Sequence, residues 1–358
     1  MALENSLYVP TLAVRASEMN GLEFSLGASK NLITPCFLLA PWANSNSLSR
    51  TIDRIERAFP NRMYFLDLDR DYQFTNLEAT AQQELAVLFE PQDCFKNWIE
   101  FVSQYPNVMP TIQTRGQSQD EIQQQIQRVQ ALNRPYLLRI VRDRFPENFV
   151  DIMDAFASSG TADFAILIEG GWTRDPLQLA VWFTGVISEI STKIDAQIPI
   201  IISCTSIPKM FSSFSSDTPT RIEFSNRVLL DQVSRNSNRA RIIYGDWAST
   251  RPREPGGFAS RPLDRIDYPG EQSWYIARNK EDEWSFEDAA EAILRSPYWD
   301  GNLGIWGEEM IQNTTISQEL GINTPQKNVA ARVNIHLHRQ AFYGTSPPPG
   351  AFEEDWED

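Results

Sequence analysis

The sequence predicts an α/β fold, a (β/α)8 barrel of the TIM-barrel type with a C-terminal extension. Short apolar runs rich in β-branched and aromatic residues recur along the chain, and segments with helical periodicity lie between them. About eight such strand-helix units precede residue 260, which is the number that closes a barrel of this type. An open doubly wound sheet shows the same alternation and stays the alternative.

The apolar runs are predicted to be parallel strands, because most are apolar on both faces, as in a sheet covered by helices. The count of eight accepts the first run as a strand although it contains Pro10. In chain order the runs are LYVPTLAV (7–14), LITPCFLLA (32–40), MYFLDLD (63–69), VMPTIQT (108–114), YLLRIV (136–141), FAILIEGG (164–171), PIIISC (199–204) and RIIYGDWA (241–248).

Helix starts are visible between several of these runs. Ser118 is followed three residues later by Glu121, a capping-box pattern that opens a segment with apolar residues at helical spacing. Asp175 is a typical N-cap, and Pro176 suits the first helical position. The segment that begins at Ser285 repeats the Ser-x-x-acid pattern.

After Trp247 the composition changes. Residues 248–270 are dense in Pro, Gly and Arg and predict a long ordered loop, which a strand at 272–279 and helices to about Tyr343 follow. The end is Pro-rich and then acidic, a composition that cannot bury enough surface to order itself. The predicted organisation is a barrel at 1–260, a strand-helix extension packed on it at 261–343, and a disordered acidic tail at 344–358.

Composition limits the classes of partner. The net charge of −15 makes direct nucleic-acid binding unfavourable, because phosphate contacts need basic surface. No apolar run approaches the ~20 residues that cross a bilayer, and the first residues lack the pattern of a signal peptide. We therefore expect no membrane partner and a cytoplasmic location in a bacterium or an infected host cell. The three dispersed cysteines are expected to be buried free thiols.

Polar residues close nearly every predicted strand, and in a barrel these strand ends meet at one mouth. Four carboxylates there could hold Mg²⁺ or Mn²⁺, which prefer oxygen ligands, and arginines could clamp a phosphate or carboxylate. A mouth that binds a partner or a small anionic ligand without metal, and simple pairing of acids with arginines, are the alternatives. The candidate residues are Asp67, Asp69, Glu169 and Asp246 for the metal, Arg115, Arg139 and Arg142 for the anion, and Gln113, Ser203 and Tyr244 beside them.

Both histidines of the chain lie close together, at His336 and His338. On a strand this spacing would point both side chains to one face, where they could reach a metal, whereas a helix would separate them. Since the chain has no other histidine, a Ser-His-acid or Cys-His nucleophilic site elsewhere is excluded.

The first 41 residues also resemble the opening of the beta protein family of bacteriophages and prophages. The segments 265–278 and 334–340 are similar to later parts of that family, so the resemblance extends to about residue 343. The matching residues of the opening are Tyr8, Pro10, Leu12, Arg15, Glu18, Leu22, Pro35 and Pro41.

The resemblance implies a protein-level role and no particular reaction. One phage member is associated with neutralising the lethal effect of a neighbouring gene product, and relatives resemble components of anti-phage loci. An antitoxin-like or defence accessory protein that binds an effector or toxin is therefore the expected function, and a metal-assisted hydrolase or phosphodiesterase at the mouth is the alternative. The candidate partner residues are Arg15 and Glu18 near the mouth, and a second cluster of Arg265, Asp267, Tyr268, Trp274, Arg278, His336 and His338. Trp274 could equally lie on an ordinary strand with one face buried.

Overall fold

The structure is a computed structural model, which describes residue 3 and residues 6–76, 78–160, 163–211, 213–253, 264–317 and 319–345, without the side chains of residues 176 and 177. The centre of the predicted loop (254–263) and the predicted acidic tail beyond residue 345 lie outside the described residues.

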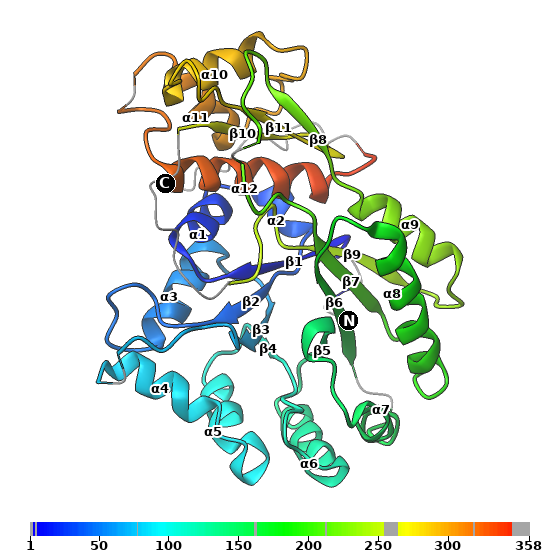
Figure 1. Cartoon of the computed structure of the whole chain (residues 1–358). Coiled ribbons are helices and arrows are strands. Elements are labelled where there is room, and N and C mark those ends of the chain that lie inside the picture. Colours follow the sequence, from blue (N-terminus) through cyan, green and yellow to red (C-terminus); the bar gives the residue numbers. More distant parts are fainter. Residues whose placement is uncertain are drawn as a thin grey trace.

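Eight parallel strands form a ring, and helices cover their outer faces (Figure 1). The strands neighbour one another in the order β4-β3-β2-β1-β9-β7-β6-β5. An isolated parallel bridge between Thr111 and Leu137 joins the two ends of this order, and the predicted (β/α)8 barrel is confirmed. Each of the eight apolar runs contributes one strand: β1 (Tyr8–Ala13), β2 (Cys36–Leu39), β3 (Tyr64–Leu68), β4 (Val108–Pro110), β5 (Tyr136–Val141), β6 (Phe164–Trp172), β7 (Ile200–Thr205) and β9 (Ile242–Asp246).

Helices connect consecutive strands across the outside of the barrel, as parallel pairing requires. The predicted helix starts are confirmed, since Ser118 and Glu121 form a reciprocal capping box and Asp175 accepts a hydrogen bond from the Gln178 amide. The connecting helices are α1 (Ala16–Glu23), α2 (Gly27–Asn31), α3 (Ser49–Ala58), α4 (Thr80–Leu88), α5 (Gln92–Ser103), α6 (Gln119–Gln130), the 3₁₀ turn Arg142–Arg144, α7 (Phe149–Ala157), α8 (Pro176–Ser191) and α9 (Asn226–Arg235).

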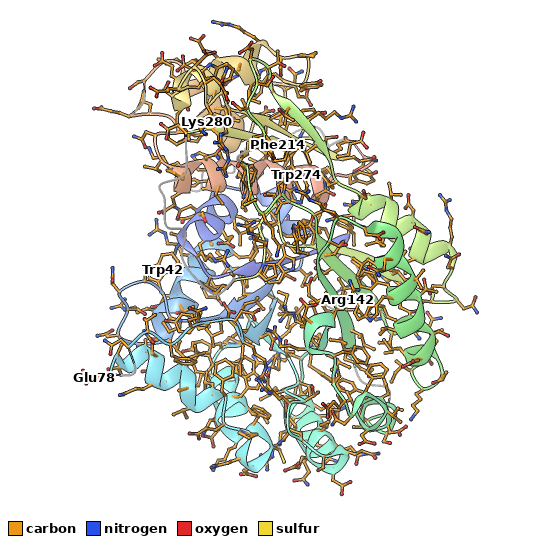
Figure 2. All side chains as sticks on the ribbon, in the orientation of Figure 1. Trp42, Glu78, Arg142, Phe214, Trp274 and Lys280 are labelled. Carbon is orange, nitrogen blue, oxygen red and sulfur yellow. The ribbon has the colours of Figure 1, made fainter. Side chains whose placement is uncertain are left out.

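A second, antiparallel sheet lies beside the barrel in the order β10-β11-β8 (Figure 1). Its edge strand β8 (Thr220–Glu223) comes from the connection between β7 and α9, so residues on both sides of position 260 build this sheet. Strand β10 (Ile266–Pro269) lies in the stretch predicted as loop, and β11 (Ser273–Ala277) is the predicted later strand. Figure 2 shows Phe214 beside Trp274, with which it packs in one apolar cluster under this sheet.

Three helices complete the C-terminal part: α10 (Phe286–Arg295), α11 (Trp306–Thr314) and α12 (Pro325–Ala341). Helix α12 lies between the barrel and the small sheet (Figure 1), and most of its residues are buried. Its residues belong to two apolar clusters, one shared with the barrel helices and one with α10 and α11. This helix therefore joins the two parts of the molecule.

The inside of the barrel is apolar at the amino ends of its strands. Val9, Phe65, Leu137 and Ile201 belong to this inner cluster, and Cys36 lies with them as a buried free thiol. Cys94 and Cys204 are also buried and free, as expected. Within the described ranges, no helix is both long enough and apolar enough to span a bilayer.

Candidate functional site

A polar layer lies above the apolar layer inside the barrel, toward the carboxyl ends of the strands, which we call the mouth. Because side chains alternate along a strand, the inward residue two positions after Phe65 is Asp67, and the one after Leu137 is Arg139. Glu169 on β6 and Ser203 on β7 lie next to each other in the same layer.

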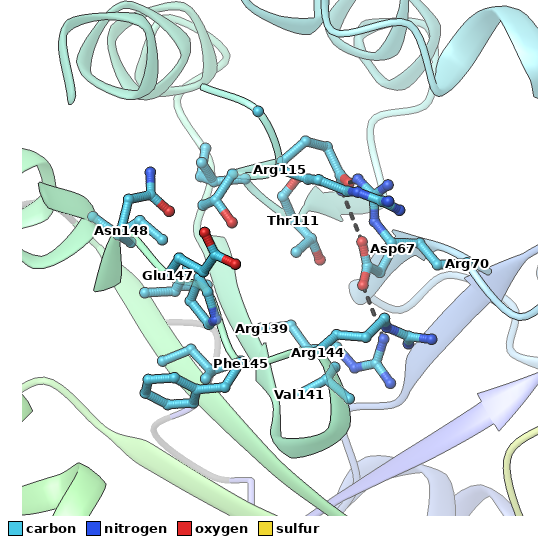
Figure 3. A pocket seen from close by; sticks show the side chains of 18 residues that line it. Asp67, Arg70, Thr111, Arg115, Arg139, Val141, Arg144, Phe145, Glu147 and Asn148 are labelled. Atoms are coloured by element: carbon cyan, nitrogen blue, oxygen red, sulfur yellow. Dashed lines mark hydrogen bonds and ion pairs between the residues drawn. The ribbon is translucent and has the colours of Figure 1, made fainter. Parts of the chain in front are cut away.

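Asp67 and Arg139 form a buried ion pair, with 3.1 Å between Asp67 Oδ2 and Arg139 Nη1 (Figure 3). Asp67 Oδ1 accepts a hydrogen bond of 2.7 Å from Gln113 Nε2, and Gln113 Oε1 accepts one of 2.6 Å from Arg70 Nη2. Burial alone would lower the pKa of Arg139, but the nearby acidic groups, of which Asp67 has the largest effect, together outweigh burial and raise that pKa. The four side chains form one network that holds two guanidinium groups at the mouth.

Glu169 is held on the other side of the layer. Its Oε2 accepts a hydrogen bond of 3.0 Å from Ser203 Oγ, and its Oε1 accepts one of 3.1 Å from the Gly171 amide. The amide points back because β6 is irregular between Glu169 and Trp172, where Gly171 has a φ of +71°. Burial raises the pKa of the Glu169 carboxyl, although the charge of Arg139 acts in the opposite direction.

Two more acids lie at the mouth, and each has its own arginine. Asp69 accepts a hydrogen bond of 2.6 Å from Arg253 Nε. Glu18 lies 3.3 Å from Arg15 Nη1 and accepts a hydrogen bond of 3.2 Å from Thr250 Oγ1. Burial raises the pKa of Glu18, and Arg15 and Arg253 oppose that effect. Arg15 and Glu18 thus contact the segment after β9, at Arg251 and Thr250, and their role in binding a partner stays a prediction.

Tyr244 and Asp246 lie elsewhere, which corrects the predicted convergence of four carboxylates. On β9 the inward residue is Gly245, so its neighbours face outward, under α12. Asp246 Oδ2 lies 2.6 Å from His336 Nε2 and accepts a hydrogen bond of 2.8 Å from the Tyr244 hydroxyl, while the Tyr8 hydroxyl donates to Oδ1. Among the described residues, no group of three or more His, Cys, Asp or Glu side chains is arranged to hold a metal ion.

The second predicted cluster is buried rather than exposed to a partner. Asp267 accepts hydrogen bonds from Arg332, at 2.5 Å, and from Arg265, at 2.8 Å. The remaining members make separate internal contacts: the Tyr268 hydroxyl donates to Glu308, Trp274 packs on Phe224, Arg278 donates to the Phe211 carbonyl, His336 pairs with Asp246, and His338 Nδ1 lies 2.9 Å from Ser29 Oγ. Because α12 is a helix, the two histidines point to different neighbours.

A pocket of about 540 Å³ opens at the mouth between β4 and β5, and we call it the seam pocket (Figure 3). Leu138, Ile140, Phe145 and Ile152 form the apolar part of its wall. Its charged lining consists of Arg70, Arg115, Arg139, Arg144, Asp67 and Glu147.

Sequence reasoning found only some of these residues. Asp67, Gln113, Arg115 and Arg139 were candidates, but Arg70 and Arg144 were missed although each lies within three residues of a strand end. Arg142, which was expected to clamp an anion, lies instead over the ring of Trp182.

The whole chain also has recognisable relatives. A family model described as Beta protein matches residues 8–342. The chain belongs to this family. Protein beta of Enterobacteria phage P4 is 28% identical over 364 aligned residues, which cover 99% of this chain and 98% of that protein. The resemblance expected from the sequence is thus confirmed, and it extends over nearly the entire chain.

Two segments that carry the resemblance to the Beta protein family come from opposite ends of the chain and meet in the structure. Tyr8 lies on β1 and His336 on α12, and both contact the Asp246 carboxylate. Burial would raise the pKa of Asp246, but His336 and the two tyrosine hydroxyls outweigh it and lower that pKa. These segments of the Beta protein family therefore hold α12 against the barrel.

Proposed function

We propose that this member of the Beta protein family is a phage-associated accessory protein that binds and controls an effector protein encoded by a neighbouring gene. The effector would be a toxin or part of an anti-phage system in the cytoplasm of a bacterium or an infected cell. Membership of the family supports the phage association, and an antitoxin-like role is what the resemblance to that family implies.

The observation that carries the proposal is the surface around the mouth. Arg115 and Arg144 are exposed there, in a chain whose net charge is −15. Phe74 lies in the connection after β3 and exposes 38% of its surface. Phe145 lies in the connection after β5 and exposes 37%. Arginines and aromatic residues dominate the energetics of protein interfaces. An acidic segment of the effector is the partner chemistry that matches this surface.

The metal-assisted hydrolase has less support from the geometry. It requires Asp67, Asp69, Glu169 and Asp246 around one point, and Asp246 lies on the outer face of the barrel. Asp67 is paired with Arg139, and Asp69 with Arg253. Glu169 accepts hydrogen bonds from the Ser203 hydroxyl and the Gly171 amide, so the three remaining carboxylates have separate hydrogen-bond partners.

Co-expression tests the proposal. The tagged chain is expressed with each product of the adjacent genes, and co-purification and growth of the host are measured. The double variant Arg115→Ala/Arg144→Ala removes the two exposed arginines of the mouth. We expect the unaltered chain to co-purify with one neighbour and restore growth, and the double variant to lose at least ~90% of the complex.

A matched control is Arg221→Ala/Arg295→Ala, because both side chains are exposed in the C-terminal part and pair with nearby glutamates. It should bind like the unaltered chain. The proposal fails if no neighbouring product binds or is neutralised. If both double variants bind equally well, the mouth is not the binding surface.

A further inference from the structure

The wall of the barrel is incomplete beside the seam pocket. Strand β4 has three residues, and its contact with β5 consists of the isolated bridge Thr111–Leu137 and a hydrogen bond of 2.8 Å from the Ile112 amide to the Leu137 carbonyl. On its other edge β5 pairs with β6 over six residues. The two strands therefore separate toward the mouth.

Because of this separation, the seam pocket is lined by side chains from both faces of the sheet. Asp67, Thr111 and Arg139 come from the inner face. Leu138 and Ile140 come from the outer face and belong to the apolar cluster between the strands and the helices. One end of the pocket is consequently charged, and the other is apolar.

The charged end contains donors and acceptors that the described part of the chain does not satisfy. Thr111 Oγ1 and Arg139 Nε are buried and have no hydrogen-bond partner among the described residues. Thr111 is 2% exposed, and the Arg139 side chain 4%. Unsatisfied buried polar atoms are uncommon in native proteins, and a bound ligand is one explanation.

The same end has an excess of positive charge. Four arginines and two carboxylates line the pocket, and Arg70 donates to the neutral amide of Gln113. Arg144 forms an ion pair with Asp71, outside the lining. Figure 3 shows Arg70, Arg139 and Arg144 around Asp67, with Phe145, Glu147 and Asn148 on the opposite side. An anion would therefore be attracted to the side of Arg70 and Arg139.

We propose that the seam pocket binds a small amphipathic organic anion. Its carboxylate or phosphate group lies at Arg70 and Arg139, and its apolar body lies along Ile140, Ile152 and Phe145. The volume of about 540 Å³ is that of a small-molecule site. This inference goes beyond the proposed function, because it assigns a ligand to the inner arginines, whereas the effector would contact the exposed ones.

Calorimetric titration of the purified full-length chain tests this site without any effector. The probes are hexyl phosphate and hexanoate, with inorganic phosphate as the anion lacking an apolar body and hexanol as the apolar body lacking a charge. We expect saturable binding of at least one hexyl anion, at least about tenfold tighter than inorganic phosphate and hexanol. Whichever of hexyl phosphate and hexanoate binds more tightly identifies the preferred head group, phosphate or carboxylate. Tighter binding of either one supports the site.

The variant Arg70→Gln should weaken binding of the hexyl anion at least about tenfold, because a charge-assisted contact is lost. Arg62→Gln is the matched control, since Arg62 precedes β3 at the opposite end of the barrel and donates to Asn31. Circular dichroism checks that both variants are folded, and the probe comparison on the unaltered chain does not depend on them. The proposal is overturned if neither anion binds at about 10 mM, if hexanol binds equally well, or if folded Arg70→Gln binds normally.

Discussion

At the scale of single residues, several buried aspartates of this protein are each held by one or two arginines. Asp67 pairs with Arg139, Asp69 with Arg253, and Asp267 with Arg265 and Arg332. Removing one member of a buried ion pair leaves the other charge buried without a partner. The resulting loss of folding stability is larger than the stability that the intact pair contributes. The sequence shows the acids and the arginines, but it does not show which of them meet.

The substitution Asp267→Asn is expected to lower the free energy of unfolding by about 3–5 kcal/mol, because it leaves Arg332 buried without a counter-charge. Asp300→Asn is the matched control. It removes the partner of Arg339 at a carboxylate whose side chain is 41% exposed, and should cost no more than about 1 kcal/mol. Urea unfolding at pH 7 measures both variants, and equal losses would contradict the argument.

The contacts of Asp267 also make the stability of the protein depend on pH. Burial would raise the pKa of Asp267, but Arg265 and Arg332 outweigh it and lower the pKa below the ordinary 3.8. The stabilisation by Asp267 is therefore complete above pH 3.8 and decreases as the pH falls toward the lower pKa of the folded state. The difference in stability between the unaltered chain and Asp267→Asn should shrink over that interval in acid titrations of unfolding.

At the scale of elements, α12 depends on glycines in its neighbours. A Cβ atom on Gly21 of α1 would lie 2.6 Å from the Ala330 carbonyl oxygen and 2.8 Å from Val333 Cβ. A Cβ atom on Gly307 of α11 would lie 2.7 Å from the Ala331 carbonyl oxygen. Both helices can therefore pack against the α12 backbone only because these positions lack a side chain.

Two Gly→Ala substitutions in helices should consequently change the stability of the protein in opposite directions. Gly21→Ala is expected to destabilise by about 1–3 kcal/mol, since α1 must move away from α12. Gly185→Ala on α8 has no described atom within 4 Å of the new methyl group, and should stabilise by about 0.5–1 kcal/mol through helix propensity. Thermal or urea unfolding of both variants tests this, and a stabilised Gly21→Ala would show that the contact is not tight.

Elements whose signal is local were predictable from the sequence, and elements that depend on distant partners were not. The capping box at Ser118 and the eight apolar runs each identify an element from a few neighbouring residues. Strand β10 lies in a Pro- and Gly-rich stretch, and pairing with β11 makes it a strand. The position of Asp246 at the end of an apolar run predicts it at the mouth, whereas the alternation of side chains from the inward Gly245 turns it to the outer face. The seam pocket depends on how β4 meets β5, which no local pattern encodes.

At the scale of the whole molecule, the barrel and the C-terminal part share a sheet and a helix. Strand β8 leaves the barrel after β7 and pairs with β11, and α12 returns to cover Tyr8 and Tyr244 on the outer face of β1 and β9. The two parts therefore bury each other's surface. The predicted division at residue 260 follows the change in composition, whereas these contacts cross it.

A chain that ends at residue 260 should therefore not fold as an independent barrel. It would lose α12 and His336, so that Asp246 and the two tyrosines lose their cover, and β8 would lose its partner β11. We expect this truncated chain to be insoluble, or to unfold without a cooperative transition, where the full chain unfolds cooperatively. Ending the chain at residue 345 instead keeps every described element and is the matched control. A soluble chain of residues 1–260 with a cooperative urea transition would show that the barrel is an autonomous domain and that α12 is an addition to it.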